Sequence, residues 1–358
     1  MKVVFVTQTL DPAHAALAQT LDLVGALAAR ADEVVVLCRE DRWGDAPANA
    51  EIRSYGESSK AGRALAYERQ LAASIGGADA VLAHMVPTFL VLAAPLAKAR
   101  RVPLLLWYTH WHAGLPLRVA TALCDAALSV ETSSYPVASP KVRGIGHAID
   151  VRAFAAAPLE PHEGPLRLLA PGRTARWKGL ATLLEAFALA VDGGLDATLE
   201  LRGPSLTADE RSHRVELAAT IAADSRLHGR ARIEEPLPRA ELPALLAASD
   251  IVVNPVEPSS GVALDKAVYE GAACARPVVS TNPALKPFLS DLPLTLLAPP
   301  RDPQALAEVL LAAGTAVPAA RTAAGVELRR RVVASHSLDH WADEVIGAIR
   351  ELRSTRAQ

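Results

Sequence analysis

The sequence predicts an α/β protein with two domains, each built on a doubly wound parallel sheet. Three observations support this prediction. The chain has 358 residues, which is too long for one ordinary hydrophobic core. Short apolar strands alternate with helical patterns, as in parallel sheets covered by helices on both faces. The alternation stops at a polar, Pro-rich segment, residues 156–164, and then starts again, so we take this segment as a linker.

The first half begins with a strand, a helix and a second strand. Residues 2–7 are a β-branched run, a helical pattern extends over about 14–29, and residues 33–37 form another apolar strand. This order predicts a βαβ unit and therefore a parallel sheet. Residues 39–52 are polar and contain Gly and Pro, which predicts a loop, and a helix is expected over about 61–74.

Histidines follow two further strands of the first half. The strand at 80–83 ends in His84, and the strand at 103–108 leads to His110. Ligands of open parallel sheets bind at the carboxyl ends of strands, so both histidines are candidates for ligand contact. The alternative is that each histidine only satisfies its local structure. A last strand of this half is expected at 125–130.

The second half repeats the alternation. A strand at 166–170 leads through Gly172 and Arg173 to a helix that we expect to begin at Lys178, with apolar residues recurring at helical spacing. Strands are also expected at 197–202 and 232–233. Further helices are expected at about 208–222, 238–248, 303–313, 318–333 and 338–352.

Composition narrows the class of protein. With 51% hydrophobic and 21% charged residues, the chain is globular rather than disordered. The net charge of −2 argues against broad nucleic-acid binding. Cys38, Cys124 and Cys274 are far apart, so neither a disulfide framework nor a metal site is expected. No signal peptide and no membrane-spanning apolar run is visible, so we expect a cytoplasmic protein.

Residues 251–281 predict an anion-binding segment made of a strand, a Pro/Ser/Gly loop, a helix and a second strand. The helix N-terminus offers free N–H groups and a positive dipole end at the carboxyl edge of the sheet. Lys266 and Glu270 lie four residues apart on one helix face, so a cation and a carboxylate can hold one ligand together. The alternative is a surface ion pair, for which Lys before Glu is the weaker order.

Basic residues after strand 166–170 extend this candidate site. Arg173 and Lys178 should lie at the same sheet edge as the loop that contains Ser260 and Gly261. Two positive charges, backbone N–H groups and a helix N-terminus suit a diphosphate, and Glu270 is then placed to accept hydrogen bonds from ribose hydroxyls. Each cation taken alone is equally explained as a solvated surface charge.

These residues resemble the family 4 glycosyltransferases of the GT-B fold over nearly the whole chain. The matching motifs are Ala83-His84-Met85, Trp107-Tyr108-Thr109-His110, Ile145-Gly146-His147 with Ile149-Asp150 and Phe154, Gly172-Arg173 with Lys178-Gly179, and Glu270-Gly271-Ala272-Ala273-Cys274 before Pro277-Val278-Val279. The resemblance implies two Rossmann-like domains facing a cleft. Residues 1–157 would be the acceptor domain, 165–334 the nucleotide-sugar domain, and 335–358 a C-terminal helix that returns to the first domain.

The resemblance also implies an activity. Such enzymes transfer a hexose-type sugar from a nucleoside-diphosphate sugar, usually with retention and without a bound metal, and the donor substrate is the only small-molecule partner besides the acceptor. By motif position, Gly172, Arg173 and Lys178 would bind the donor diphosphate and Glu270 the ribose, while His110 would lie near the reacting sugar. His110, Arg173 and Lys178 are thus the candidate catalytic residues.

The chain departs from the family pattern at two places. Val262 stands where the family commonly has a Glu that touches the donor sugar. Some relatives instead have a Ser/Gly loop followed by a Lys at the position of Lys266, so donor recognition is expected from Ser260, Gly261 and the backbone around Val262. The Gly pair after the first strand is also replaced, and His14 is a candidate substitute there. We expect the acceptor near His14 and His84.

Other functions stay open from the sequence. One is a noncatalytic nucleotide-sugar-binding subunit, and another is a nucleotide-sugar epimerase of the same fold. A dehydrogenase is disfavoured because no GxGxxG follows the first strand. The acceptor is a glycan, a lipid-linked sugar or a small molecule. Lys98, Arg100 and Arg101 form a basic cluster that is either a peripheral contact to an anionic membrane or an ordinary solvated helix end.

Overall fold

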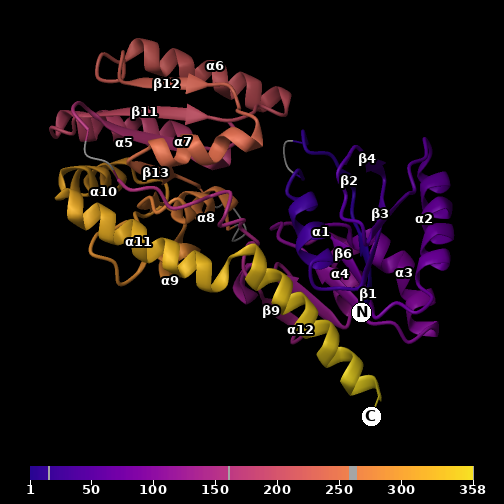
Figure 1. The fold of residues 1–358 in the computed structure, drawn as a ribbon. Helices are drawn as coiled ribbons and strands as arrows, with labels where there is room; N and C mark the ends of the chain where they lie inside the picture. Colours follow the sequence, from indigo (N-terminus) through magenta and orange to yellow (C-terminus); the bar gives the residue numbers. More distant parts are fainter. Residues whose placement is uncertain (15–16, 160–161, 258–263, 358) are drawn as a thin grey trace. The chain divides into compact units, whose positions relative to one another are not determined.

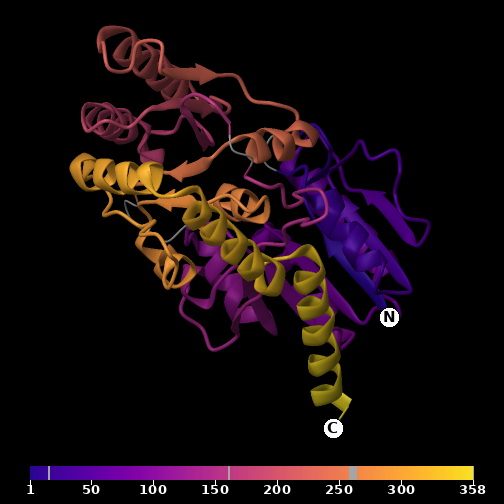
Figure 2. The same cartoon turned by 60° about the vertical axis from the view of Figure 1, so that its left-hand side comes forward.

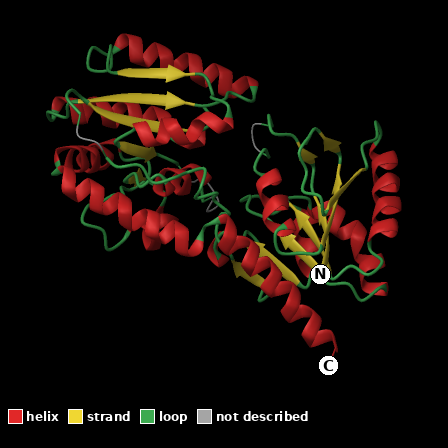
Figure 3. Ribbon diagram, viewed as in Figure 1, coloured by secondary structure: helices red, strands yellow, loops and turns green. Residues whose placement is uncertain are grey.

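The computed structural model describes residues 1–14, 17–159, 162–257 and 264–357. These residues divide into two compact units. Unit 1 comprises Met1–Asp150 and Ser335–Gln358, and unit 2 comprises Val151–Ala334. Strands and helices alternate along both units (Figure 3).

Unit 1 is built on a parallel sheet with strand order β5-β3-β1-β6-β7-β8-β9. Its strands are β1 (Lys2–Val6), β3 (Glu33–Cys38), β5 (Ala50–Ser54), β6 (Ala80–His84), β7 (Leu104–Trp107), β8 (Ala126–Ser129) and β9 (Val142–Gly144). All of these pairings are parallel, and a short separate pair joins β2 (Thr9–Leu10) to β4 (Glu40–Asp41). The chain leaves β1 toward β3 and later returns to pair β6 with the other side of β1 (Figure 1). This reversal is the topological switch point of the sheet.

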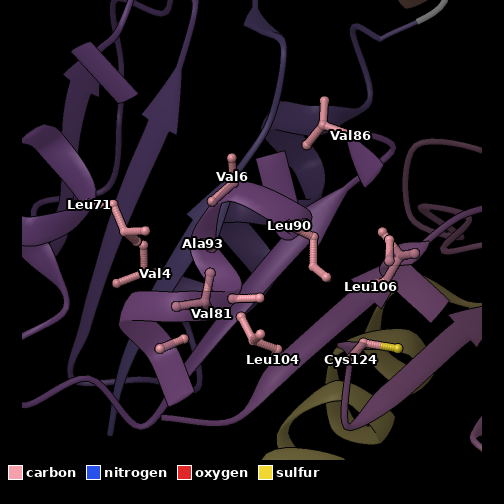
Figure 4. Close-up of a cluster of buried hydrophobic side chains, with 14 of the residues drawn as sticks. Val4, Val6, Leu71, Val81, Val86, Leu90, Ala93, Leu104, Leu106 and Cys124 are labelled. Carbon is pink, nitrogen blue, oxygen red and sulfur yellow. The ribbon is translucent and has the colours of Figure 1, made fainter. Parts of the chain in front are cut away.

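Helices cover the sheet of unit 1. They are α1 (Thr20–Ala28), α2 (Lys60–Ser74), α3 (Pro87–Ala99), α4 (Leu115–Leu123) and α12 (Leu338–Ala357). Figure 4 shows the core on one face, where Val4, Val81 and Leu104 of the sheet meet Leu71 of α2 and Leu90 of α3. Burial of these apolar side chains stabilises the unit by roughly 1.5–3 kcal/mol each.

The last helix, α12, belongs to unit 1 and runs beside its N-terminal helix (Figure 2). Trp341 of α12 is fully buried, and its ring lies 5.9 Å from the ring of Trp107 in an edge-to-face arrangement. Arg30 after α1 donates to Asp343 at 2.6 Å and to Asp339 at 3.0 Å. The helix therefore fills core space that the rest of unit 1 leaves open.

Unit 2 has a second parallel sheet, with strand order β12-β11-β10-β13-β14. Its strands are β10 (Leu166–Pro171), β11 (Ala197–Arg202), β12 (Ala231–Glu234), β13 (Ile251–Asn254) and β14 (Val278–Ser280). Its helices are α5 (Leu180–Asp192), α6 (Ala208–Ala223), α7 (Leu242–Ala248), α8 (Lys266–Ala273), α9 (Lys286–Leu289), α10 (Pro303–Thr315) and α11 (Pro318–Ser335). Short 3₁₀ turns lie at Thr132–Ser134 of unit 1 and at Arg176–Lys178, Arg239–Glu241 and Pro283–Leu285 of unit 2.

Several elements differ from the sequence prediction. The first helix begins at Thr20 instead of near His14, and β5 occupies residues that the polar composition assigned to a loop or left unassigned. The helix expected from Lys178 begins at Leu180, because Gly179 adopts a left-handed conformation with φ of 63° and ends the preceding 3₁₀ turn. The helix expected over 238–248 is a 3₁₀ turn followed by α7.

Within the described ranges, no single helix is long and apolar enough to span a membrane. Helices α10 and α11 meet this test of length and composition only as a pair, with a bend of 109° between them.

Candidate functional site

The candidate site of unit 2 lies at the switch point of its sheet. Strand β10 has β11 on one side and β13 on the other, so the chain reverses direction across the sheet between β10 and β13. Ligands of open α/β sheets bind outside the carboxyl ends of such strands. The salt bridge between Lys178, which follows β10, and Asp265, which follows β13, lies there with an Nζ to Oδ1 distance of 2.7 Å.

Backbone contacts hold the two loops together. Glu257 after β13 donates its N–H to the carbonyl of Trp177 at 2.7 Å. A Cβ at Gly179 would lie 1.7 Å from the carbonyl oxygen of Pro255, so only glycine permits this approach. Lys178 is buried between these contacts, and its ammonium lies 4.6 Å from the ring centroid of Trp177. Its position is thus fixed by the fold before any ligand binds.

Asp265 is held by a chain of polar contacts from the sheet. Asn254, the last residue of β13, donates to Asp265 Oδ2 at 2.9 Å. Ser280 of β14 in turn donates to Asn254 Oδ1 at 3.0 Å. The residue before α8 therefore keeps its carboxylate directed at Lys178.

Arg173 lies next to this pair but has its own partner. It follows Gly172, and a Cβ at Gly172 would be 3.6 Å from the ammonium of Lys178. The guanidinium of Arg173 donates through Nε and Nη2 to Glu210 of α6, while 41% of the Arg173 side chain is exposed. Glu210 is buried and also accepts the N–H of Leu206 at 2.7 Å. One edge of the guanidinium is therefore engaged, and the exposed part faces solvent.

Glu270 is the buried anion of the site. Its carboxylate accepts from Arg239 Nη1 at 3.1 Å and lies 3.3 Å from Lys266 Nζ. Burial raises the pKa of Glu270, but the positive charges of Lys266 and Arg239 outweigh burial, and the net pKa is below its usual value. The carboxyl is therefore ionised at neutral pH.

The ion pair of Lys266 and Glu270 is not the surface pair considered from the sequence. Glu270 is only 4% exposed, whereas the side chains of Lys266 and Arg239 are 25% and 29% exposed. A surface pair contributes little and needs no buried carboxylate. This carboxylate is instead buried, and its two cationic partners are partly exposed.

Sequence reasoning did not single out Arg239, Asp265 or Glu210. Arg239 follows β12 and Asp265 precedes α8, so both lie at the carboxyl edge where Arg173 and Lys178 were expected. An Asp directly before a helix is a recognisable signal. The pairing of Glu210 with Arg173 joins residues 37 positions apart, and no local pattern indicates it.

Ser260, Gly261 and Val262 lie outside the described residues, which exclude 258–263. Of the donor-site residues expected from the sequence, the structure thus places Gly172, Arg173, Lys178, Lys266 and Glu270 in unit 2.

The candidate histidines lie in unit 1 and differ in environment. His84 is buried, its Nδ1 lies 3.1 Å from Thr7 Oγ1, and its ring stacks on Phe5. Burial lowers the pKa of His84 to about 3. His84 is therefore neutral near pH 7, and its contacts are those of a structural residue at the switch point between β1 and β6.

His110 and His14 are exposed. His110 follows β7, stacks on Trp111 and accepts the N–H of His112 at 3.1 Å through Nδ1. His14 accepts the N–H of Leu17 at 3.0 Å through Nδ1. Each histidine thus uses one ring nitrogen to hold its own loop.

Within residues 1–14, 17–159, 162–257 and 264–357, no group of three or more His, Cys, Asp or Glu side chains is arranged to hold a metal ion.

Comparison with known proteins supports the interpretation of unit 2. Residues 165–314 match the family model described as "Glycosyl transferases group 1". No curated protein matches the sequence.

Solved structures resemble the whole chain. HepE from Anabaena, solved with UDP-glucose, has a TM-score of 0.74 at 17% identity, and the match covers 98% of this chain and 100% of that one. A glycosyltransferase from Rickettsia africae has a TM-score of 0.74 at 15% identity, with 98% of both chains covered. Sucrose-phosphate synthase from Thermosynechococcus elongatus has a TM-score of 0.70 at 17% identity, with 99% of both chains covered.

These matches confirm the predicted fold class of two Rossmann-like parallel-sheet domains. The chain has the fold of the GT-B glycosyltransferases, and its residues 165–314 match the group 1 glycosyltransferase family.

Proposed function

We propose that the protein transfers a hexose from a nucleoside-diphosphate sugar to an acceptor, with retention and without a bound metal, as a family 4 glycosyltransferase. The observation that carries this proposal is the set of charges at the switch point of unit 2. Lys178, Lys266, Arg239 and Arg173 lie around the carboxyl ends of β10, β12 and β13, and each is oriented by a carboxylate. HepE binds UDP-glucose and has the same fold, which supports a nucleotide sugar as the donor.

The cations stabilise the diphosphate leaving group. Breaking the bond between the sugar and the phosphate leaves negative charge on the diphosphate, which preorganised cations stabilise more in the transition state than in the ground state. Lys178 is held in place by Asp265 and Trp177, so little reorganisation is needed when charge develops. The exposed edge of Arg173 supplies a second cation.

Glu270 positions the nucleoside. Its carboxylate is ionised, and in this role it accepts hydrogen bonds from the ribose hydroxyls, while Lys266 and Arg239 keep it charged despite burial. In unit 1, His110 contacts the donor sugar, because its ring is exposed at the end of β7 and held by its own loop. His14 lies at the acceptor side of the same unit.

Release of nucleoside diphosphate tests the proposal. The protein is incubated with a panel of nucleotide sugars, and Lys178→Ala is compared with Lys286→Ala, which removes an exposed lysine of α9. We expect Lys178→Ala to lower turnover about 100-fold or more and Lys286→Ala to leave it unchanged. Equal turnover in both folded variants would refute the role of Lys178.

Two other outcomes would replace the proposal. Binding of a nucleotide sugar without any release of nucleoside diphosphate would indicate a noncatalytic subunit. Interconversion of donor sugars without release would indicate an epimerase.

A further inference from the structure

Unit 1 contains a cavity at the carboxyl edge of its sheet that no predicted site residue lines. The cavity has a volume of ≈ 280 Å³. Its walls come from residues after four strands, from α2 and from the start of α3: Gln8, Arg39, Tyr55, Arg63, Met85, Val86, Pro87, Thr88 and Phe89. Gln8 follows β1 and Met85 follows β6, so the cavity lies at the switch point of this sheet, where ligands of open α/β sheets bind.

The lining carries positive charge without a compensating carboxylate. Arg39 and Arg63 contribute guanidinium groups, and none of the lining residues is acidic. Among the residues that the structure describes, neither arginine takes part in an ion pair. The neighbouring carboxylates Glu40 and Asp11 pair with Arg42 instead, at 2.5 and 3.5 Å.

Backbone groups hold the guanidinium of Arg63 and the main chain of Arg39. Arg63 Nη1 donates to the carbonyls of Glu57 at 2.9 Å and Ser58 at 3.2 Å. The backbone N–H of Arg39 donates to Gln8 at 3.0 Å. A Cβ at Gly56 would lie 2.4 Å from the Arg39 carbonyl oxygen, so the strand ends are closely packed. The Arg63 guanidinium is therefore held in place on α2, and Arg39 extends its exposed side chain from a closely packed strand end.

Tyr55 shows that both charges act on the cavity. Its hydroxyl donates to the carbonyl of Thr7 at 2.5 Å. Burial raises the pKa of Tyr55 well above its usual value, and the charges of Arg39 and Arg63 oppose that rise. Both guanidinium groups thus lower the pKa of a phenol that lines the same cavity.

The start of α3 adds to the positive field. Pro87 has no N–H, and Phe89 donates its N–H to the Val86 carbonyl at 3.0 Å, so Thr88 supplies the N–H of this first turn that can face a ligand; Val86 provides no side-chain cap. The N-terminus of a helix carries partial positive charge, and Val86 to Phe89 line the cavity.

We propose that this cavity binds a phosphate group of the acceptor. The proposal rests on the glycosyltransferase function proposed above and names the class of its acceptor. One guanidinium fork suffices for the two oxygens of a carboxylate, whereas a phosphate can use two separate arginines and a helix N-terminus at once. Thr109 donates its N–H to Met85 Sδ at 3.3 Å, so the cavity adjoins the loop that carries His110. A phosphate bound there holds the acceptor beside the residue assigned to the donor sugar.

Calorimetric titration with glucose 6-phosphate, glucose and glucuronate tests the proposal. We expect glucose 6-phosphate to bind at least about 10-fold more tightly than glucose or glucuronate, and Arg39→Gln and Arg63→Gln each to remove about 10-fold of that affinity. Arg69→Gln on the exposed side of α2 is the matched control and should change nothing. Thermal unfolding confirms that each variant is folded.

Vesicles of phosphatidylglycerol distinguish the source of the phosphate. Binding of glucose 6-phosphate that depends on both arginines supports a soluble phosphorylated acceptor. Vesicle binding that falls in Arg39→Gln and Arg63→Gln but not in Arg69→Gln supports a lipid-borne phosphate. Glucose 6-phosphate that binds equally to the folded variants and the wild type overturns the proposal, as does preference for glucuronate.

Donor hydrolysis separates this proposal from the proposed function. In Arg39→Gln and Arg63→Gln, release of nucleoside diphosphate to water should match the wild type, because neither arginine belongs to unit 2. A protein that hydrolyses donor but shows no arginine-dependent phosphate binding refutes the acceptor class alone. A protein that binds phosphate through these arginines but never releases nucleoside diphosphate refutes the transferase function and leaves the cavity as a phosphate site.

Discussion

Replacing Glu270 by Gln removes the buried negative charge between Lys266 and Arg239 while keeping the shape of the side chain. Breaking a fully buried ion pair costs about 3–5 kcal/mol, whereas a surface pair contributes about 0–1 kcal/mol. Here the carboxylate is 4% exposed, and its partners are 25% and 29% exposed. The free-energy cost of breaking this ion pair should therefore lie between those two values. We expect Glu270→Gln to lower the free energy of unfolding by about 2 kcal/mol.

Thermal unfolding measures this loss. For a unit of the size of Val151–Ala334, 2 kcal/mol corresponds to a fall in Tm of about 4–8 °C. Glu185→Gln, on the exposed side of α5, is the matched control and should leave Tm nearly unchanged.

The pH dependence gives a second check. The folded pKa of Glu270 is lowered, so its stabilisation is complete above the unfolded pKa of about 4.3 and is lost as pH falls through the folded value. The Tm difference between wild type and Glu270→Gln should therefore be full at pH 7 and shrink below about pH 4. A Glu270→Gln protein as stable as Glu185→Gln at pH 7, or a difference that persists in acid, would refute the reasoning.

Three other predictions concern separate features. Gly179→Ala should destabilise unit 2 by more than the roughly 1–2 kcal/mol of a left-handed alanine, since its Cβ would lie 1.7 Å from the Pro255 oxygen. Gly229→Ala, at φ of 74° with nothing within 4 Å, is the control in denaturant unfolding, and equal losses would contradict the prediction. His84 should stay neutral from pH 8 to pH 5 in an NMR titration, because burial lowers its pKa to about 3; a midpoint above pH 5 would disprove this. Lys98, Arg100 and Arg101 line a ≈ 550 Å³ hollow together with Arg353 and Arg356 of α12. We expect salt-sensitive sedimentation with anionic vesicles that a Lys98→Gln, Arg100→Gln, Arg101→Gln variant loses, and salt-insensitive or absent binding would exclude membrane contact.

The fold class could be predicted from the sequence because parallel sheets leave a strong local signal. Strands buried on both faces, such as Glu33–Cys38, read as continuous apolar runs. Strands at the exposed edge of a sheet were harder to predict from the sequence. Strand β5 has the sequence AEIRS and is only partly buried, so its composition resembles that of a loop.

The site was predictable only in part. The sequence pattern shows which residues follow a strand, but it does not show which side chains form ion pairs with them. Placement of Arg173, Lys178 and Glu270 at the carboxyl edge follows from the order of strand, loop and helix. The carboxylates that hold the cations, Glu210 and Asp265, come from other segments and depend on tertiary packing. The unit 1 cavity could not be predicted from the sequence for the same reason. Arg39 and Arg63 line one cavity only when β3 and α2 pack together.

The division of the chain has a consequence for how the protein is made. Unit 2 is one continuous stretch, whereas unit 1 is interrupted and receives its last part from Ser335 onward. On the ribosome, residues up to Asp150 emerge first but still lack Trp341, Val345 and Ile349, which are buried in the finished core. Unit 2 is thus complete before unit 1, because unit 1 must wait until α12 has been synthesised. A premature stop before α12 would leave a chain with a complete unit 2 and with uncovered apolar surface on unit 1, which chaperones and proteases recognise.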